Sequence, residues 1–182
     1  MDKRFAEIAI SELEIQTRIK ELAEEISKDY KGKIPVILCV LKGGVYFLTD
    51  LTKKLKIDCE IEFMVLSSYG KQRESKGIVE IKKDLSIDLK GRDVIIVEDI
   101  FDSGLTLKYL YSYIKIRKPK SLEICTLIDR PHKRNSNVNL KAKYIGFLFS
   151  KSDFLVGFGL DDNEILRNTP YIGVLKKDYY GE

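Results

Sequence analysis

The hydrophobic residues of this chain form two kinds of pattern, which alternate along its length. Mainly apolar runs at 35–41, 94–97 and 122–128 have the length and composition of strands that are buried on both faces of a parallel sheet. A further strand is expected over 60–67, with a return strand at 79–81 that would make the pair a hairpin. After the runs at 35–41 and 94–97, apolar residues recur at helical spacing, so these two strands are each expected to lead into a helix, whereas a surface loop is expected over 134–143.

The first predicted helix begins at a clear start signal. Ser11 and Glu14 form a capping box, in which each side chain can satisfy a backbone N–H group of the first turn. The apolar residues that follow on one helix face are Ile15, Ile19, Leu22 and Ile26. A second helix follows the strand at 35–41, and its apolar residues are Phe47, Leu48, Leu51 and Leu55.

The most informative stretch of the chain is 94–107. Four apolar β-formers are followed at once by two carboxylates, Glu98 and Asp99. The segment Asp102-Ser103-Gly104 then interrupts the apolar pattern, and helical spacing begins at Thr106. The order is therefore a strand, an acidic turn, a short loop and a helix.

This strand-to-helix turn has the groups that an anion-binding site needs. Backbone N–H groups of residues 103–106 would point outward at the helix N-terminus, where two hydroxyl side chains and the helix dipole favour a phosphate. Glu98 and Asp99 would accept hydrogen bonds from hydroxyl groups or bind a divalent cation. A sugar phosphate bound with Mg²⁺ meets both demands. The simpler alternative is that Asp102 only caps the helix, but the density of polar groups favours the ligand site.

Composition limits the classes of protein to which the chain can belong. With 182 residues, 44% of them hydrophobic, it is long enough for one domain over 1–182 and short for two. Its formal net charge of +4 is too small an excess for a nucleic-acid-binding surface. The longest apolar run, 36–41, is far shorter than a membrane span. We therefore expect a soluble, cytoplasmic protein without nucleic-acid or membrane partners.

The cysteines and the single histidine exclude two other kinds of site. Cys39, Cys59 and Cys125 lie in strand-like runs, which predicts core residues in a reducing compartment and no disulfide framework. His132 is the only histidine, and one histidine cannot build a zinc site. The basic cluster at 132–134 is expected on the solvated surface.

The stretch 94–107 resembles the ribose-phosphate-binding signature of the type I phosphoribosyltransferases. The resemblance extends over about 38–175, where the sequence is similar to the hypoxanthine-guanine branch of that family. It implies an α/β fold with a central, mainly parallel sheet flanked by helices, a flexible β-hairpin loop and a small hood. The N-terminal segment and about 144–182 would form the hood.

The resemblance assigns the ribose phosphate to this stretch. Glu98 and Asp99 would contact the ribose hydroxyls of phosphoribosyl pyrophosphate. The loop that holds the 5′-phosphate would consist of Asp102, Ser103, Gly104, Leu105 and Thr106. Asp102, as the loop residue nearest the purine, would also be the general acid/base for the proton on purine N7.

The pyrophosphate would be bound by a second strand-end loop. Taken alone, Lys42-Gly43-Gly44 would indicate an ordinary turn between the strand at 35–41 and its helix. Its position one βα unit before the acidic motif resembles the family's pyrophosphate loop, in which a cis peptide bond is common, here between Leu41 and Lys42. Arg167 would contact the pyrophosphate from the hood.

Two further features are implied by the resemblance. Mg²⁺ would be bound by Glu98, Asp99 and Asp161. Ser68 and Tyr69 resemble the start of the flexible catalytic loop, which would close over the site and exclude water.

The purine would be held by residues near the C-terminus of the last buried strand and in the hood. Phe154 matches the aromatic residue that stacks on the base, and Leu155 would offer backbone groups to its edge. Arg130 lies where the family usually has a lysine that donates to the exocyclic oxygen. Arginine is planar and bidentate, so it can still donate to a 6-oxopurine, but with a different geometry.

The implied function is transfer of the phosphoribosyl group to hypoxanthine or guanine, in a homodimer or homotetramer. Two alternatives stay open from the sequence. The same fold could serve a nucleotide-sensing regulator, although no helix-turn-helix segment is appended. The same enzyme class could instead act on adenine, xanthine or uracil, of which xanthine is the hardest to exclude.

Overall fold

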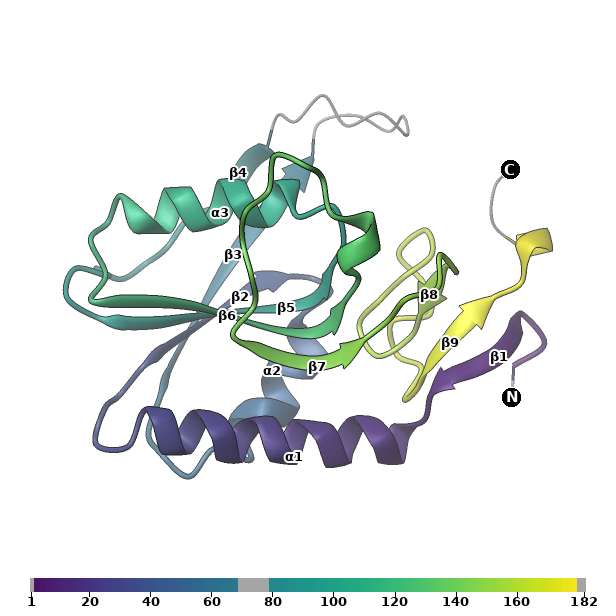
Figure 1. Ribbon diagram of the computed structural model, residues 1–182, viewed down its shortest axis with the longest axis horizontal. Coiled ribbons are helices and arrows are strands. Elements are labelled where there is room, and N and C mark those ends of the chain that lie inside the picture. Colours follow the sequence, from purple (N-terminus) through teal and green to yellow (C-terminus); the bar gives the residue numbers. More distant parts are fainter. Residues whose placement is uncertain (1, 69–78, 180–182) are drawn as a thin grey trace.

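The computed structural model describes residues 2–68 and 79–179, and these residues form two β-sheets with flanking helices (Figure 1). The larger sheet has six strands in the order β4-β3-β2-β5-β6-β7, and the smaller has three in the order β1-β9-β8. The strands are β1 Phe5–Ile10, β2 Val36–Leu41, β3 Glu60–Ser68, β4 Val79–Lys83, β5 Asp93–Phe101, β6 Ser121–Asp129, β7 Tyr144–Leu148, β8 Leu155–Val156 and β9 Ile172–Leu175. The helices are α1 Glu12–Asp29, α2 Val45–Thr52 and α3 Leu105–Lys115, with short 3-10 helices η1 Pro131–Lys133 and η2 Lys177–Tyr179.

The mainly parallel sheet confirms the strand predictions. The apolar runs at 35–41, 94–97 and 122–128 are β2, β5 and β6, which pair in parallel with one another or with β3 and β7. At one edge β4 pairs antiparallel with β3, which makes the predicted hairpin. Within residues 2–68 and 79–179, no helix combines the length and the apolar character that crossing a membrane requires.

Strand β5 is longer than its apolar run. It continues to Phe101 because its last two residues extend the parallel ladder with Ile128 and Asp129 of β6. Glu98 and Asp99 therefore belong to the strand itself and are not part of the turn that was predicted from the sequence. A strand fixes both carboxylates more firmly than a turn would.

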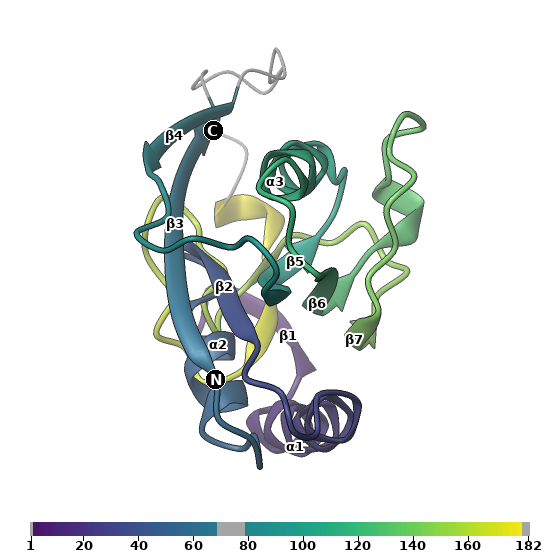
Figure 2. The same ribbon diagram turned by 90° about the vertical axis from the view of Figure 1, so that its left-hand side faces the viewer.

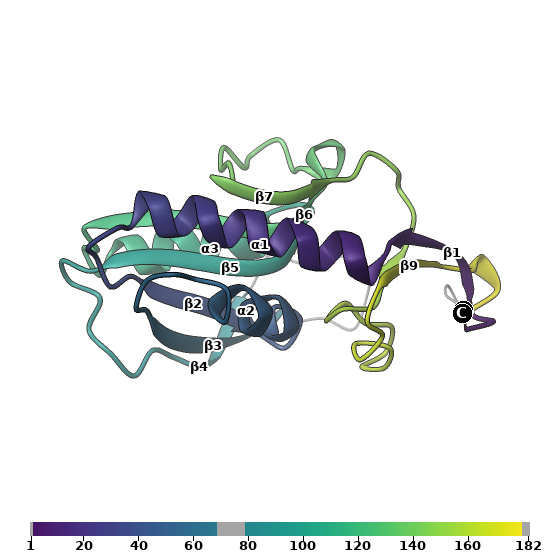
Figure 3. The same cartoon turned by 90° about the horizontal axis from the view of Figure 1, so that it is seen from below.

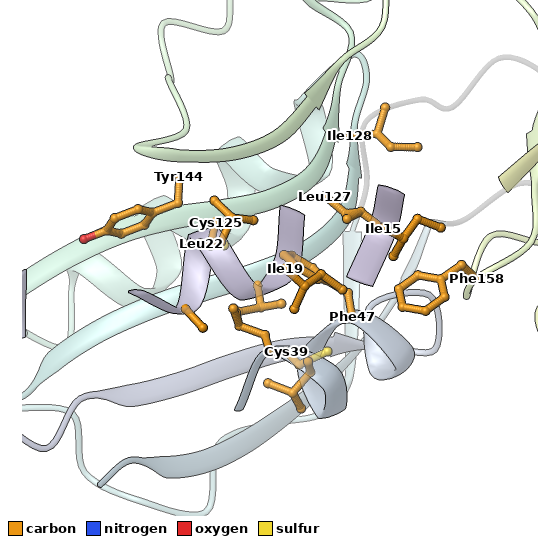
Figure 4. Packing of buried hydrophobic residues seen from close by; sticks show 14 of the residues in the cluster. Ile15, Ile19, Leu22, Cys39, Phe47, Cys125, Leu127, Ile128, Tyr144 and Phe158 are labelled. Carbon is orange, nitrogen blue, oxygen red and sulfur yellow. The ribbon is translucent and has the colours of Figure 1, made fainter. Parts of the chain in front are cut away.

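Helices cover both faces of the larger sheet, as Figure 2 shows with α3 on one side and α1 and α2 on the other. Alternate residues of β2 supply the two cores: Ile37 and Cys39 pack with α1 and α2, while Val36, Leu38 and Val40 pack with α3. Figure 3, seen from below, shows α1 crossing in front of the strands, and Figure 4 shows its apolar face packed into the core. Burial on both faces explains the mainly apolar runs.

Both predicted helices on the α1 side form, with one difference in length. The capping box is complete: the Glu14 N–H donates to Ser11 Oγ at 3.3 Å, and the Ser11 N–H donates to Glu14 Oε2 at 2.8 Å. Helix α2 ends at Thr52, so Leu55, which was predicted to lie on its apolar face, follows the helix. There the Leu55 N–H donates to the Thr52 carbonyl in a looser turn, and Leu55 still packs against the core.

The cysteines are free thiols, as predicted, and two of the three are fully buried. Cys39 and Cys125 lie in the α1-side core, and burial raises the pKa of both thiols. Cys59 is half-buried at the edge of that core.

The smaller sheet joins the two ends of the chain. Strand β1, near the N-terminus, pairs antiparallel with β9, which also pairs with β8. The sheet lies beyond the carboxyl ends of the larger sheet's parallel strands, where the hood was expected (Figure 1). Residues 144–148, which the prediction placed in the hood, instead form β7 at the edge of the larger sheet. Their parallel pairing with β6 accounts for the difference, because it makes them an edge strand of that sheet.

A buried carboxylate anchors the base of the β3–β4 hairpin. Glu62 accepts hydrogen bonds from the N–H groups of Phe63 and Ser86, from the Ser86 hydroxyl and from Lys83 Nζ, at 2.6 to 3.1 Å. Burial pushes the pKa of Glu62 upward, but these bonds outweigh it and lower the pKa to about 2. Ser68 ends β3 and pairs with Val79, whereas the predicted loop residue Tyr69 lies outside the described residues.

The order of strands creates a natural ligand-binding edge. The chain moves from β2 outward to β3, and from β5 outward to β6 in the opposite direction, although β2 and β5 are neighbours. In open α/β sheets, ligands bind at such a switch point, outside the carboxyl ends of the strands. The loops after β2 and β5 both lie there.

Candidate active site

The loop after β5 encloses a small polar pocket at the start of α3. The pocket has a volume of about 130 Å³, and its polar lining residues are Glu98, Asp102, Ser103 and Thr106. Gly104 lies just before α3 with φ 75°, and a Cβ there would collide with the Phe101 ring and with Val138. Leu105, by contrast, begins α3 and packs into the α3-side core, so only its backbone is available to a ligand.

The geometry of this pocket suits a phosphate group. Helix α3 has eleven residues, and its first N–H groups are directed at the pocket without a side-chain cap. Asp102 does not cap the helix: its carboxylate pairs with Arg130. The simple capping role considered from the sequence is therefore wrong.

Glu98 and Asp99 are two successive acids near the end of β5. Burial and the charge of Asp99 raise the pKa of Glu98 well above its usual range. Burial also raises the pKa of Asp99, to about 6, although the Ile100 N–H at 2.8 Å and the charge of Arg167 act in the opposite direction. Hydroxyl donors or a cation would stabilise this pair because either relieves the cost of neighbouring buried charges.

A second cavity adjoins the first. It has a volume of about 300 Å³, and its lining residues are Asp99, Ile100, Asp102, Arg130, Lys133, Phe154, Leu155, Leu160 and Asp161. Both cavities are lined by Ile100 and Asp102, so the aspartate stands where they meet. Phe154 and Leu155, which were predicted to contact the purine, both line this cavity, and Leu155 lies in β8.

Arg130 holds Asp102 in a fixed position. Its Nε and Nη2 donate to the two Asp102 carboxylate oxygens at 2.7 and 2.9 Å, and its Nη1 donates to the Asp153 carbonyl at 2.7 Å. The guanidinium is buried, with a side-chain exposure of 4%. Three of its five N–H groups are thus used within the protein, which leaves two to meet a ligand. A lysine could not span these three acceptors.

Arg134 is a site residue that the sequence reasoning missed. It was expected on the solvated surface, but it donates from Nη1 to the Asp102 carbonyl at 2.6 Å and forms a buried ion pair with Asp129. Its guanidinium also lies over the Phe101 ring, 3.1 Å from the centroid. Arg134 therefore supports the loop between β5 and α3 through its hydrogen bond to the Asp102 backbone. The usable signal was Asp129, an acid at the end of a buried strand, which needs a partner. His132 is exposed, as expected.

Arg134 and Asp129 also line a third cavity, of about 640 Å³, together with Ile145 of β7 and the loop at 138–142. This cavity is mostly apolar and contains none of the predicted substrate-binding residues.

The loop after β2 faces the acidic pair from the other side. The Leu41–Lys42 peptide bond is cis, as predicted. Gly43 packs directly against the Asp99 side chain, because a Cβ there would lie 2.6 Å from Asp99 Cγ. Lys42 Nζ pairs with Glu164 at 2.7 Å.

Arg167 reaches the same region from the hood. Its Nη2 pairs with Asp161 at 2.8 Å and with Glu164 at 3.4 Å, and its Nη1 donates to the Gly159 carbonyl. The structure thus brings both predicted pyrophosphate-binding cations, Lys42 and Arg167, to one acidic turn. Arg167 Nε is buried without a hydrogen-bond partner in the described part of the chain.

The three acids predicted to bind Mg²⁺ do not form one cluster. Glu98 lines the smaller pocket, whereas Asp99 and Asp161 line the larger one. Among the described residues, no three His, Cys, Asp or Glu side chains lie close enough together to hold a metal ion. Asp99 and Asp161 nevertheless suit Mg²⁺, which keeps several waters and is usually bound by one or two carboxylates plus substrate phosphates.

Two adjoining pockets, one polar and at the start of a helix, the other lined by Phe154, thus lie at the switch point of an α/β sheet, where such folds bind their ligands. Residues 10–163 match the family described as phosphoribosyl transferase domain. The chain belongs to this family, and the fold predicted from the resemblance is confirmed.

The curated relatives include hypoxanthine-guanine phosphoribosyltransferases and longer bifunctional proteins. The hypoxanthine-guanine phosphoribosyltransferase of Bacillus subtilis (strain 168) is 46% identical over 99% of this chain and 98% of its own length. The bifunctional protein TilS/HprT of Listeria monocytogenes (serotype 4b, strain F2365) is 46% identical over the whole chain, which spans 28% of that longer protein.

Solved structures of relatives have the same fold. A hypoxanthine phosphoribosyltransferase from Staphylococcus aureus is 42% identical and superposes with a TM-score of 0.93, covering 98% of this chain and 96% of its own. The Trypanosoma cruzi hypoxanthine phosphoribosyltransferase, in complex with the product IMP, is 36% identical with a TM-score of 0.91, covering 99% of each chain.

Proposed function

We propose that this chain transfers the 5-phosphoribosyl group of phosphoribosyl pyrophosphate to hypoxanthine or guanine, giving IMP or GMP and pyrophosphate. The observation that carries this proposal is the position of Asp102, which lines both the phosphate pocket and the aromatic-lined cavity. A nucleoside monophosphate has a phosphate at one end and a base at the other, which matches two adjoining pockets of this kind. The relative from Trypanosoma cruzi was solved with such a product, IMP.

The ribose phosphate is held by the β5–α3 segment. Its phosphate accepts hydrogen bonds from the first N–H groups of α3 and from the Ser103 and Thr106 hydroxyls. Glu98 and Asp99 accept hydrogen bonds from the ribose hydroxyls, which removes the cost of their buried charges. This arrangement would present carbon-1 of the ribose to the second cavity.

In the transfer step, the bond between carbon-1 and the pyrophosphate oxygen breaks, and a bond from carbon-1 to a purine nitrogen forms. The purine loses a proton, which the Asp102 carboxylate accepts from N7. Arg130 keeps Asp102 in position through two hydrogen bonds and directs its two remaining N–H groups to the exocyclic oxygen. Phe154 stacks on the base, and Leu155 offers backbone groups to its edge.

The leaving pyrophosphate carries most of the charge that develops. Lys42, the Gly43 N–H and Arg167 would stabilise it from two sides. Asp99 and Asp161 would hold Mg²⁺ together with substrate oxygens, and the ion would neutralise part of the pyrophosphate charge. Ser68 and Tyr69 would contribute to closing the site.

The test is pyrophosphate release by purified protein with phosphoribosyl pyrophosphate, Mg²⁺ and each base supplied separately. We expect turnover with hypoxanthine or guanine and none with adenine. Turnover with xanthine and with no other base would show that the enzyme acts on xanthine. Tight binding of phosphoribosyl pyrophosphate without turnover would favour the alternative of a nucleotide-sensing regulator. A cytoplasmic location and a homodimer or homotetramer stay predictions, which cell fractionation and light scattering would test.

A further inference from the structure

One carboxylate occupies the place where the pyrophosphate-binding cations converge. Glu164 Oε2 lies 2.7 Å from Lys42 Nζ and 3.4 Å from Arg167 Nη2, so a single oxygen bridges both cations. The two cations come from segments more than 120 residues apart in sequence. The pKa of Glu164 is lowered, chiefly by its hydrogen bond with Lys42. An anionic oxygen of pyrophosphate that contacted both cations would have to take the position that Glu164 Oε2 now occupies.

The backbone that presents Glu164 is unusual for a glutamate. Asp162 and Ile165 exchange two backbone hydrogen bonds, of 3.1 and 3.0 Å, and so close a tight turn around Asn163 and Glu164. These two central residues have φ of 49° and 70°, the pattern of a type I′ turn. Asn is common at the first of these positions and Gly at the second, where a side chain is unfavourable. A glutamate there is disfavoured by the local backbone.

Further contacts fix the direction of the turn. The Glu164 N–H donates to Asp161 Oδ2 at 2.9 Å, and Asp161 Oδ1 pairs with Arg167 Nη2. The turn is therefore joined to the site by its backbone, whereas the Glu164 side chain is 62% exposed and its partner Lys42 is 67% exposed. An exposed ion pair can exchange partners without a rearrangement of the core.

We propose that the Glu164 carboxylate occupies the position of a pyrophosphate oxygen when no substrate is bound. It then pairs with Lys42 and Arg167, and an incoming diphosphate must displace it to bind these two cations. The inference rests on the proposed function, because it takes these cations as the diphosphate site. When product pyrophosphate leaves, the carboxylate returns to the cations and so assists release. Glu164 is thus a positioning residue that weakens diphosphate binding, in contrast to the residues that strengthen it.

The expected effect has an unusual sign. Glu164→Gln keeps the size of the side chain and removes the competing charge, so magnesium pyrophosphate should bind more tightly. Because exposed ion pairs have small coupling energies, the loss of this competition should raise the affinity for pyrophosphate by roughly two- to fivefold. The KM for phosphoribosyl pyrophosphate should fall by a similar factor, while kcat stays constant or falls. The gain should shrink at high ionic strength because salt screens exposed charges.

Isothermal titration of the purified protein with magnesium pyrophosphate tests the proposal, with Asp162→Asn as the matched control. Asp162 carries the same charge two residues away, and within the described part of the chain it forms no ion pair with Lys42 or Arg167. Glu164→Gly is a second variant, which removes the carboxylate and suits the left-handed backbone. Both Glu164 variants are expected to bind pyrophosphate more tightly, and Asp162→Asn is expected to match the wild type.

Three outcomes would overturn the proposal: weaker binding by the Glu164 variants, an equal gain in Asp162→Asn, or no change in any variant. Weaker binding would mean that Glu164 holds the cations in place for the substrate. The titration needs no purine and no turnover. Failure of the wild type to transfer the phosphoribosyl group would therefore refute the proposed function separately, while the sign of the change in pyrophosphate affinity would still be measured.

Discussion

Substitution of Gly43 by alanine tests how closely the β2 loop and the acidic pair are packed. A Cβ at this position would overlap Asp99 Oδ2 and lie 2.6 Å from Asp99 Cγ, so the carboxylate would have to move by more than about 1 Å to regain a normal contact of about 3.5 Å. That movement breaks its 2.8 Å hydrogen bond with the Ile100 N–H and misaligns it for the ribose hydroxyls. A charge-assisted hydrogen bond contributes about 1.5–3 kcal/mol. Gly43→Ala should therefore raise the KM for phosphoribosyl pyrophosphate roughly tenfold to a hundredfold.

The neighbouring glycine provides a control. At Gly44 a Cβ would lie 2.8 Å from Cys39 Sγ, in the core beneath the loop. Both substitutions overpack the protein and should lower its free energy of unfolding by about 1–3 kcal/mol. Steady-state kinetics and urea unfolding on both variants separate the two effects, because only Gly43→Ala should raise KM strongly. Equal KM values for the two variants, or an unchanged KM in Gly43→Ala, would refute the reasoning.

Two further predictions concern buried charges outside the substrate pockets. The lowered pKa of Glu62, about 2 against 4.5, contributes about 3 kcal/mol to stability above pH 4.5, which is lost as pH falls toward 2. Glu62→Gln should lower the free energy of urea unfolding at pH 7, and by less at pH 3; a pH-independent difference would contradict this. Arg134→Met leaves Asp129 buried without its partner, so stability should fall by about 3 kcal/mol and kcat should fall with it. Adding Asp129→Asn should restore much of the stability but not kcat, because the Asp102 loop stays unsupported.

Local sequence signals were enough for much of the fold. The capping box at Ser11 marked the start of α1, and mainly apolar runs marked β2, β5 and β6, because burial on both faces favours apolar residues at successive positions. The end of β5 could not be found in this way. Its last residues pair with Ile128 and Asp129, and nothing in the local pattern distinguishes a polar strand end from a turn.

The loops of the site were recognisable because each follows a predicted strand. Their partners were not, since the contacts are long-range. Arg130 reaches Asp102 across 28 residues, and Lys42 reaches Glu164 across 122. The role of Arg134 was hidden for the same reason: in sequence it belongs to a basic cluster, and only the fold places it under the phosphate loop. Predictions from sequence therefore identified strand-end residues better than the side chains that position them.

The central claim is that Asp102 accepts the purine proton at the junction of the two cavities. The most direct test is the single-turnover rate of IMP or GMP formation in the wild type and in Asp102→Asn, with KM for phosphoribosyl pyrophosphate measured alongside. Asn keeps the shape of the side chain and one acceptor oxygen for Arg130. The rate should fall by about 10²- to 10⁴-fold while KM changes little. A variant that retains a tenth or more of the wild-type rate would contradict the assignment.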